Sequence, residues 1–141
     1  MILDTTYLLS LARIDIDTDL LQAIAKGKTD VKLDEICINL ISILELQAKA
    51  AKLGVPAKFI VQATEAMLKA FRVESFHNPE IIEVSYELKK LIPDYIDCVI
   101  VATAAVLKED LATEDSLILA NKEEITEKYG VKVLSFKDIV K

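Results

Sequence analysis

The sequence predicts an α/β fold, in which helices cover both faces of a short, mainly parallel, twisted sheet in a three-layer α/β/α arrangement. Three observations favour this class. Short apolar runs typical of strands alternate with longer helical segments along the whole chain. Gly27, Gly54 and Gly130 each follow a helical run, where a left-handed residue ends a helix. The 141 residues are 52% hydrophobic and 28% charged, which suits one domain over residues 1–141.

The first part of the chain contains two predicted strands. The apolar start of the chain predicts a strand over residues 2–4, and the EICIN stretch predicts another over residues 35–39. Helices are predicted over residues 5–13 and 18–26, between the two strands. The long run NLISILELQAKAAKL predicts a helix over residues 40–53, which directly follows the second strand.

The middle of the chain is predicted to be mostly helical. A helix over residues 57–71 leads into a short strand over residues 72–76. The tripeptide HNP is typical of a loop that enters a helix, here predicted over residues 79–91. Pro93 marks the approach to the next helix, over residues 95–108, which is almost wholly apolar and is expected to be buried.

The last part of the chain repeats the strand–helix–strand pattern. A strand is predicted over residues 111–113, a helix over residues 116–129 and a final strand over residues 131–134. Because all three glycines serve as helix stops, none remains to build a loop that cradles phosphate. A P-loop and a dinucleotide-binding fingerprint are both absent.

Composition narrows the function further. The net charge of −6 argues against a simple nucleic-acid coat protein, but not against an enzyme whose acids hold a cation. Cys37 and Cys98 lie in apolar stretches and are predicted to be buried thiols. With His77 as the sole histidine, neither a zinc site nor a histidine-based catalytic unit is expected. No signal peptide is recognisable, and residues 98–107 form too short an apolar run to cross a bilayer, so we expect a cytoplasmic protein.

Two aspartates follow predicted strands. Asp4 ends the first strand, and Asp115 comes just after the strand that ends at Thr113. In a parallel sheet, functional sites form where strands end and helices begin, so both carboxylates are expected at the same edge of the sheet. Helix capping is the simpler interpretation of each residue taken alone, because aspartate is a favoured N-cap.

Two further acids lie in predicted helices. Asp94 and Asp97 flank the start of the apolar helix, and we expect Asp94 to be the cap and Asp97 to be the site residue, because an unpaired buried carboxylate is costly. Glu45 lies at the boundary of the apolar face of its helix. An exposed pair with Lys49, one turn away, is the alternative interpretation of Glu45.

If these acidic side chains lie close together in the folded protein, they require a bound cation. Two like charges about 5 Å apart repel by roughly 3 kcal/mol at an effective dielectric constant near 20, so several carboxylates cannot all stay ionised alone. Carboxylates without imidazole or thiolate neighbours are hard oxygen ligands, which favour Mg²⁺ or Mn²⁺ over zinc.

Four stretches in this order resemble the PIN-domain family of metal-dependent ribonucleases, and the resemblance covers nearly the whole chain. LDTTYLL is an apolar strand that gives Asp4 and then hydroxyl residues. ISILELQAKA is a helix with Glu45 inside an apolar run. IDCVIVATAAVLKEDLATED is the most specific stretch, with Asp97, an apolar helix of small residues and then Leu-x-Thr-x-Asp ending at Asp115.

The resemblance implies a Mg²⁺- or Mn²⁺-dependent endoribonuclease. It identifies the catalytic and metal-binding residues as Asp4, Glu45, Asp97 and Asp115. Thr113 and Thr6 would orient an acid or a bound water, and Asp94 would support the site. Family members of this length are similar to the toxin of VapBC toxin–antitoxin pairs, which implies an RNA substrate, an antitoxin that blocks the acidic residues, and a homodimer.

Some features depart from the family pattern. The stretch TEDSLIL lacks the aromatic residue that often follows the last Thr-x-Asp, and Glu114 adds a charge beside the predicted site. With only two arginines in the chain, RNA would be held mainly by lysines. Lys49, Lys52 and Lys58 are candidates, although a solvated helix face is the simpler interpretation.

Other function classes fit less well. A non-catalytic PIN-like module that acts by protein contact is the main alternative, and the presence of all four acids disfavours it. A phospho-accepting receiver domain would need an acidic pair beside the first strand and a lysine after the last strand, but Asp4 has no acidic neighbour and Lys132 lies inside or before the last strand. A haloacid-dehalogenase-like phosphatase would need a second aspartate where Thr6 stands.

Overall fold

The computed structural model describes residues 1–141 and contains a five-stranded sheet in which every strand pair is parallel. The strands are β1 (Ile2–Leu3), β2 (Cys37–Asn39), β3 (Arg72–Glu74), β4 (Leu111–Ala112) and β5 (Val133–Leu134). Each lies inside its predicted range, and the predicted α/β class is confirmed.

Helices connect the strands. The α-helices are α1 (Leu20–Ala25), α2 (Leu40–Lys52), α3 (Ala57–Ala70), α4 (Pro79–Leu88), α5 (Tyr95–Leu107), α6 (Ser116–Ala120), α7 (Lys122–Tyr129) and α8 (Phe136–Ile139). Two 3-10 helices are η1 (Thr5–Ala12) and η2 (Leu33–Glu35). Gly130 ends α7 with a φ of 74°, a left-handed conformation that favours glycine, as the sequence predicts.

Three helical features differ from the sequence-based expectation. The helix predicted over residues 116–129 is divided into α6 and α7 at Asn121, whose side-chain amide donates to the Leu117 carbonyl at 2.8 Å and so closes α6 early. The segment predicted as a helix after Asp4 is the 3-10 helix η1, which starts with a bond between residues three apart, from Tyr7 N to Asp4 O. Neither η2 nor α8 was predicted.

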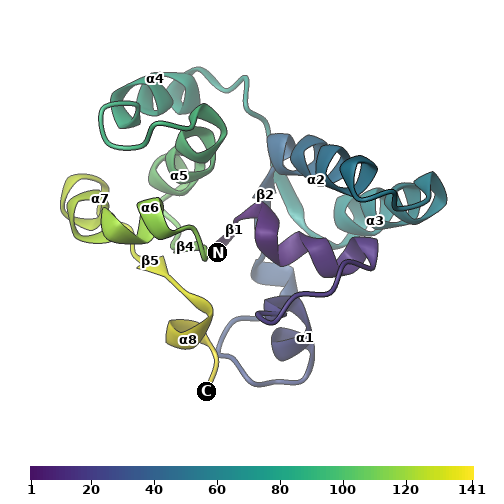
Figure 1. Cartoon of the computed structure of the whole chain (residues 1–141). Coiled ribbons are helices and arrows are strands. Elements are labelled where there is room, and N and C mark those ends of the chain that lie inside the picture. The colour runs from purple at the N-terminus through teal and green to yellow at the C-terminus, as the bar shows by residue number, and fades with distance from the viewer.

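The sheet lies between two helical layers (Figure 1). Alternate strand residues point to opposite faces, so Ile2, Cys37 and Leu111 pack with α4, α5, α6 and α7 in one apolar core. On the other face, Leu3, Ile38 and Ala112 pack with η1, α1, α2 and α3. Helix α5 is the most buried helix, as its apolar sequence predicts.

The two cysteines, Cys37 and Cys98, are buried free thiols, which confirms their prediction. None of the helices combines the length and the hydropathy that crossing a lipid bilayer requires.

The strand order explains where a site can form. The order across the sheet is β3-β2-β1-β4-β5, so β1 is central. The chain first winds outward from β1 through β2 to β3, then crosses back and winds outward in the other direction through β4 to β5. The direction therefore reverses between β1 and β4, and in parallel sheets the carboxyl ends of strands at such a reversal flank a ligand site. Asp4 and Thr113 follow these two strands directly.

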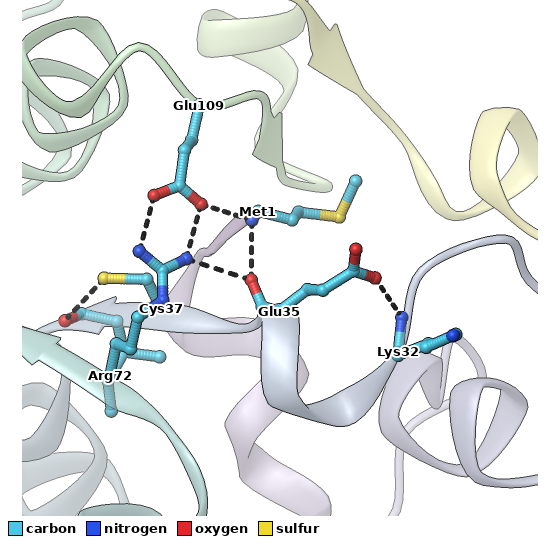
Figure 2. A network of polar contacts seen from close by, with 7 residues as sticks. Met1, Lys32, Glu35, Cys37, Arg72 and Glu109 are labelled. Carbon is cyan, nitrogen blue, oxygen red and sulfur yellow. Dashed lines mark hydrogen bonds and ion pairs between the residues drawn. The ribbon is translucent and has the colours of Figure 1, made fainter.

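The opposite edge of the sheet is closed by an ion-pair network (Figure 2). Glu109 accepts two hydrogen bonds from the Arg72 guanidinium, at 2.7 and 2.6 Å, and one at 2.6 Å from the α-amino group of Met1. Arg72 and the Met1 amine also donate to the Glu35 carbonyl, at 3.1 and 2.8 Å. The network therefore ties together the segments that lead into β1, β2, β3 and β4.

Removing the central carboxylate of this network should destabilise the fold. The hydrogen bonds from Arg72 hold the pKa of Glu109 at about 2, below its ordinary value of 4.5, so the ionised form is favoured in the folded state. We expect Glu109→Gln to lower the free energy of unfolding at pH 7 by about 1–3 kcal/mol in urea denaturation. This stabilisation is present above pH 4.5 and is lost toward pH 2. The difference in the free energy of unfolding between Glu109→Gln and the wild type should therefore become smaller as the pH falls.

Asp30→Asn is the matched control, because Asp30 forms an exposed ion pair with Lys141. Its effect should stay within about 0.5 kcal/mol. Equal effects of the two substitutions would contradict a special role for the Glu109 network.

Candidate active site at the carboxyl edge of the sheet

Asp4 is a buried carboxylate at the end of β1. It is 6% exposed and N-caps η1, with Oδ1 accepting from Thr5 N at 2.7 Å. Its Oδ2 accepts from the Thr113 hydroxyl at 2.6 Å. Burial raises the pKa of Asp4, the two hydrogen bonds oppose the rise, and the charges of Glu45 and Asp115 add to it. Asp4 therefore caps η1 and is also a carboxylate whose ionised form is disfavoured by burial.

Thr113 joins the two central strands. It is fully buried immediately after β4, and its hydroxyl both donates to Asp4 and accepts from Asp115 N at 3.0 Å. One side chain thus fixes the position of Asp4 and the start of the loop that carries Asp115. The proposed orienting role of Thr113 rests on these contacts.

Asp115 shows that capping and a site role are compatible. Its Oδ1 accepts from Leu117 N and Ile118 N, both at 2.9 Å, and so caps α6. Its Oδ2 accepts no hydrogen bond from the chain and remains available for a ligand. The two interpretations of Asp115 that the sequence leaves open therefore do not exclude each other.

Asp97 lies in the first turn of α5, as expected, and Asp94 is the cap. The Asp94 carboxylate accepts from Asp97 N at 3.0 Å. Partial burial raises the pKa of Asp97 to about 7, and the negative charges of Asp115, Asp94, Asp4 and Glu45 contribute to the rise. The acids named from the sequence are thus close enough to influence one another electrostatically.

Glu45 reaches this group from α2. It is half-buried, and its charge contributes to the raised pKa of both Asp4 and Asp97. No ion pair joins Glu45 to Lys49, so the surface-pair alternative for Glu45 is absent from the structure. We refer to Asp4, Glu45, Asp97 and Asp115 together as the acidic edge.

Sequence reasoning missed a polar contact that positions α2 and α5 around the acidic edge. Asn39 ends β2, caps α2 by accepting from Ile41 N at 2.9 Å, and donates to the buried Thr103 hydroxyl of α5 at 2.9 Å. Like Asp4, Asn39 is a polar residue at the end of a buried strand, and this was the available signal. Near Glu45 on α2, the buried Ser42 hydroxyl has no hydrogen-bond partner.

The remaining candidate residues have other surroundings. Thr6 is half-buried and makes no side-chain hydrogen bond within the chain, so its orienting role stays a prediction. Glu114 accepts hydrogen bonds from the Tyr7 hydroxyl and from Phe136 N. This carboxylate therefore holds α8 against η1. His77 is exposed in the loop before α4, and its imidazole ring forms no hydrogen bond or ion pair within the chain.

The acidic edge fits a hard divalent cation by its donor chemistry, because every ligand it offers is a carboxylate oxygen. No lysine or arginine forms an ion pair with any of the four acids. No three of them are already arranged to share one ion.

Comparison with known proteins identifies the family. The sequence model of the PIN domain matches residues 1–123. The chain belongs to the PIN domain family. PIN domains are generally nucleases that depend on divalent metal ions. Among curated protein sequences, none matches this chain.

Solved structures of PIN proteins share the fold. A toxin–antitoxin complex from Klebsiella pneumoniae matches with a TM-score of 0.58 and 22% identity, covering 82% of this chain and 86% of that chain. FitAB bound to an IR36 DNA fragment matches with a TM-score of 0.65 and 18% identity, covering 96% and 94%. VapBC2 from Rickettsia felis, bound to promoter DNA, matches with a TM-score of 0.60 and 20% identity, covering 95% and 96%.

The Thr113 hydroxyl should contribute far more to stability than the hydroxyl of Thr5, which is also buried. Thr113→Val removes both of its hydrogen bonds and leaves the buried Asp4 carboxylate under-solvated, so we expect a loss of about 1–3 kcal/mol in the free energy of unfolding. Thr5→Val is the matched control, because the Thr5 hydroxyl is buried without a partner. Its substitution should be neutral or stabilising. Chemical denaturation of both variants tests the contrast, and similar losses would contradict it.

The burial of Asp97, together with repulsion from its acidic neighbours, should make the metal-free protein less stable at higher pH. Because the pKa of Asp97 is about 7 in the folded protein and near 3.8 when unfolded, the folded state holds more protons between these values. This contribution to stability is therefore present at low pH and is lost as the pH rises through 7. In the presence of a chelator, Asp97→Asn should have a higher melting temperature than the wild type at pH 8. The difference in melting temperature should be smaller at pH 5. An identical difference at both pH values would contradict the prediction.

Proposed function

We propose that this PIN-domain protein is a Mg²⁺- or Mn²⁺-dependent endoribonuclease and the toxin of a type II toxin–antitoxin pair. The observation that carries the proposal is the placement of Asp4 and Asp97 within reach of the charges of Glu45 and Asp115 at the carboxyl edge of a parallel sheet, where those charges contribute to the raised pKa of Asp4 and Asp97. Four separate segments contribute to this one edge. Such uncompensated negative charge is costly in the absence of a cation, and it is the donor set that magnesium and manganese use.

In this proposal the chain's own residues prepare the site. Asp4 is fixed by Thr5 and Thr113, and Asp115 keeps one oxygen free while the other caps α6. Asp97 and Glu45 complete the ligand set from α5 and α2. A bound Mg²⁺ or Mn²⁺ ion would supply a more acidic water and would neutralise charge that develops on the phosphodiester. Thr113, and by prediction Thr6, would orient an acid or a water.

The proposed substrate is RNA, whose phosphate groups need positively charged contacts. RNA would then be held beside the edge by exposed lysines. Lys49 and Lys52 lie on α2, which also carries Glu45, and Lys58 lies in the first turn of the neighbouring α3. These side chains are the proposed contacts to the phosphate backbone.

The proposed partners follow from the family resemblance and from the solved complexes that share the fold. The matching structures are toxin–antitoxin complexes, two of them with DNA fragments. For this chain we propose a cytoplasmic homodimer and an antitoxin that covers the acidic edge. An antitoxin that fills this edge needs positive side chains, because the chain supplies no counter-charge of its own there.

One observation favours the alternative of a non-catalytic PIN-like interaction module. No three carboxylates stand ready to hold a single ion, so binding requires side-chain movement. Tight Mn²⁺ binding without cleavage of any RNA would favour this alternative over the nuclease.

RNA cleavage by matched variants tests the proposal. The purified wild type should cleave mixed single-stranded RNAs with Mg²⁺ or Mn²⁺, and chelator should stop it. Asp4→Asn should lose at least about 100-fold in cleavage rate, because it removes a charge from the proposed ligand set. Asp30→Asn, at the other edge of the sheet, should cleave like the wild type. Equal cleavage by Asp4→Asn and the wild type would indicate a contaminating nuclease.

A further inference from the structure

Glu114 links three segments of the chain through one carboxylate oxygen. Its Oε2 accepts a hydrogen bond from the Tyr7 hydroxyl of η1 and another, at 2.7 Å, from Phe136 N of α8. Glu114 is half-buried, and no lysine or arginine forms an ion pair with it. These two neutral donors therefore hold the Glu114 side chain in place, because a carboxylate removed from water needs hydrogen-bond donors.

The tyrosine that contacts Glu114 belongs to the segment that Asp4 begins. Tyr7 is fully buried in η1, and its backbone N–H donates to the Asp4 carbonyl at 3.2 Å. The Asp4 carboxylate caps the same 3-10 helix. Tyr7 and Asp4 are therefore joined within one helical turn, and a shift of the Tyr7 ring would also move Asp4.

Two adjacent residues after β4 thus contact the segment that follows β1. The Thr113 hydroxyl donates to Asp4 at 2.6 Å, and Glu114 accepts from Tyr7. A single contact leaves two segments free to rotate about it, whereas two contacts at separate points restrict both their distance and their orientation. Asp115 follows these two residues directly, and the ligands of a metal ion must be held within about 0.5 Å. The contact of Glu114 with Tyr7 therefore acts on the geometry between Asp4 and Asp115.

Helix α8 can support Glu114 because it is anchored to the rest of the chain by other contacts. Its Ile139 side chain is 8% exposed and packs in the apolar core on the η1 side of the sheet. Just after the helix, Lys141 N donates to the Lys28 carbonyl at 2.9 Å. The whole of α8 lies beyond residues 1–123, the part of the chain that the PIN-domain model matches. The support for Glu114 therefore comes from a segment outside that match.

We propose that Glu114 is a positioning residue for the acidic edge. Through its hydrogen bonds to Tyr7 and α8, it fixes Asp115 relative to Asp4 and so sets the affinity of the edge for Mg²⁺ or Mn²⁺. This inference rests on the metal-binding part of the proposed function. Groups that orient metal ligands without touching the ion typically change metal affinity by roughly 10–100-fold when they are removed.

A direct role as a further metal ligand is the competing interpretation of Glu114. A ligand would need the negative charge of Glu114, and the Tyr7 hydroxyl would then be dispensable. A positioning residue needs an acceptor oxygen for its two donors, which the carbonyl of a glutamine side chain also supplies. The engagement of Oε2 by both donors favours the positioning role.

Calorimetric titration of the metal-free full chain with Mn²⁺ tests the inference. Tyr7→Phe removes the hydroxyl and leaves every carboxylate of the chain in place, so it should raise the dissociation constant for Mn²⁺ about tenfold. Glu114→Gln retains an acceptor for both donors and should keep most of the wild-type affinity. Tyr129→Phe is the matched control, because the Tyr129 hydroxyl donates to Glu87 at 3.0 Å in another part of the chain. It should bind Mn²⁺ like the wild type.

Melting curves in chelator separate positioning from stability. Each variant is titrated at a temperature at which its circular dichroism shows that it is folded. A purely structural role of the Tyr7 hydroxyl would lower the melting temperature and leave the Mn²⁺ dissociation constant of the folded protein unchanged.

A second pair of variants tests the contribution of α8 and serves even if Tyr7→Phe does not fold. Phe136 is the first residue of α8, a position that accepts proline, and Phe136→Pro removes the N–H that donates to Glu114. Phe136→Ala loses the same aromatic ring but keeps that N–H. The dissociation constant for Mn²⁺ should be several-fold higher in Phe136→Pro than in Phe136→Ala. Equal values would overturn the role of α8.

The remaining outcomes separate this inference from the proposed function. If Asp4→Asn weakens Mn²⁺ binding but Tyr7→Phe binds like the wild type, the positioning role is wrong and the metal site stands. An affinity that falls in Glu114→Gln and not in Tyr7→Phe makes Glu114 a direct ligand, which also overturns the positioning role. A wild type that binds no Mn²⁺ overturns the metal-binding part of the proposed function and this inference with it.

Discussion

The hydrogen bond from the Thr113 hydroxyl to the Asp4 carboxylate is the contact on which the acidic edge depends. Both groups are buried, and an ionisable carboxylate away from water is costly unless its oxygens are paired. The sheet order makes the pairing possible, because β1 and β4 are neighbours although more than 100 residues separate Thr113 from Asp4. A single hydroxyl thus links the folding of the central strands to the placement of the acids.

The parts of this arrangement that the sequence predicts are those governed by local pattern. Apolar runs place the strands, and an aspartate that directly follows a strand must lie at the carboxyl edge of a parallel sheet. Asp4 and Asp115 could therefore be assigned to one edge without coordinates. What the sequence left open was the choice between cap and ligand, and Asp115 shows that two oxygens on one side chain allow both.

The parts that the sequence does not predict depend on contacts between remote segments. Asn121 interrupts the last long helix because its amide finds a carbonyl, and an asparagine inside a polar helical run gives little warning of this. Helix α8 is held by Glu114, which the sequence indicates only as an extra charge beside the predicted site. The bond between Asn39 and Thr103 joins residues 64 positions apart, and no local periodicity reveals it.

The network of Arg72, Glu109 and Met1 has a consequence for the polarity of the whole molecule. At one rim of the sheet, Glu109 is paired with two cationic groups of the chain, whereas the acids of the other rim have no ion-pair partner within the chain. The sheet therefore separates a rim whose ion pairs form within the chain from the acidic edge, whose carboxylates have no cationic partner in the chain. Whatever binds at the acidic edge, whether an inorganic ion or the side chain of another protein, must therefore bring positive charge.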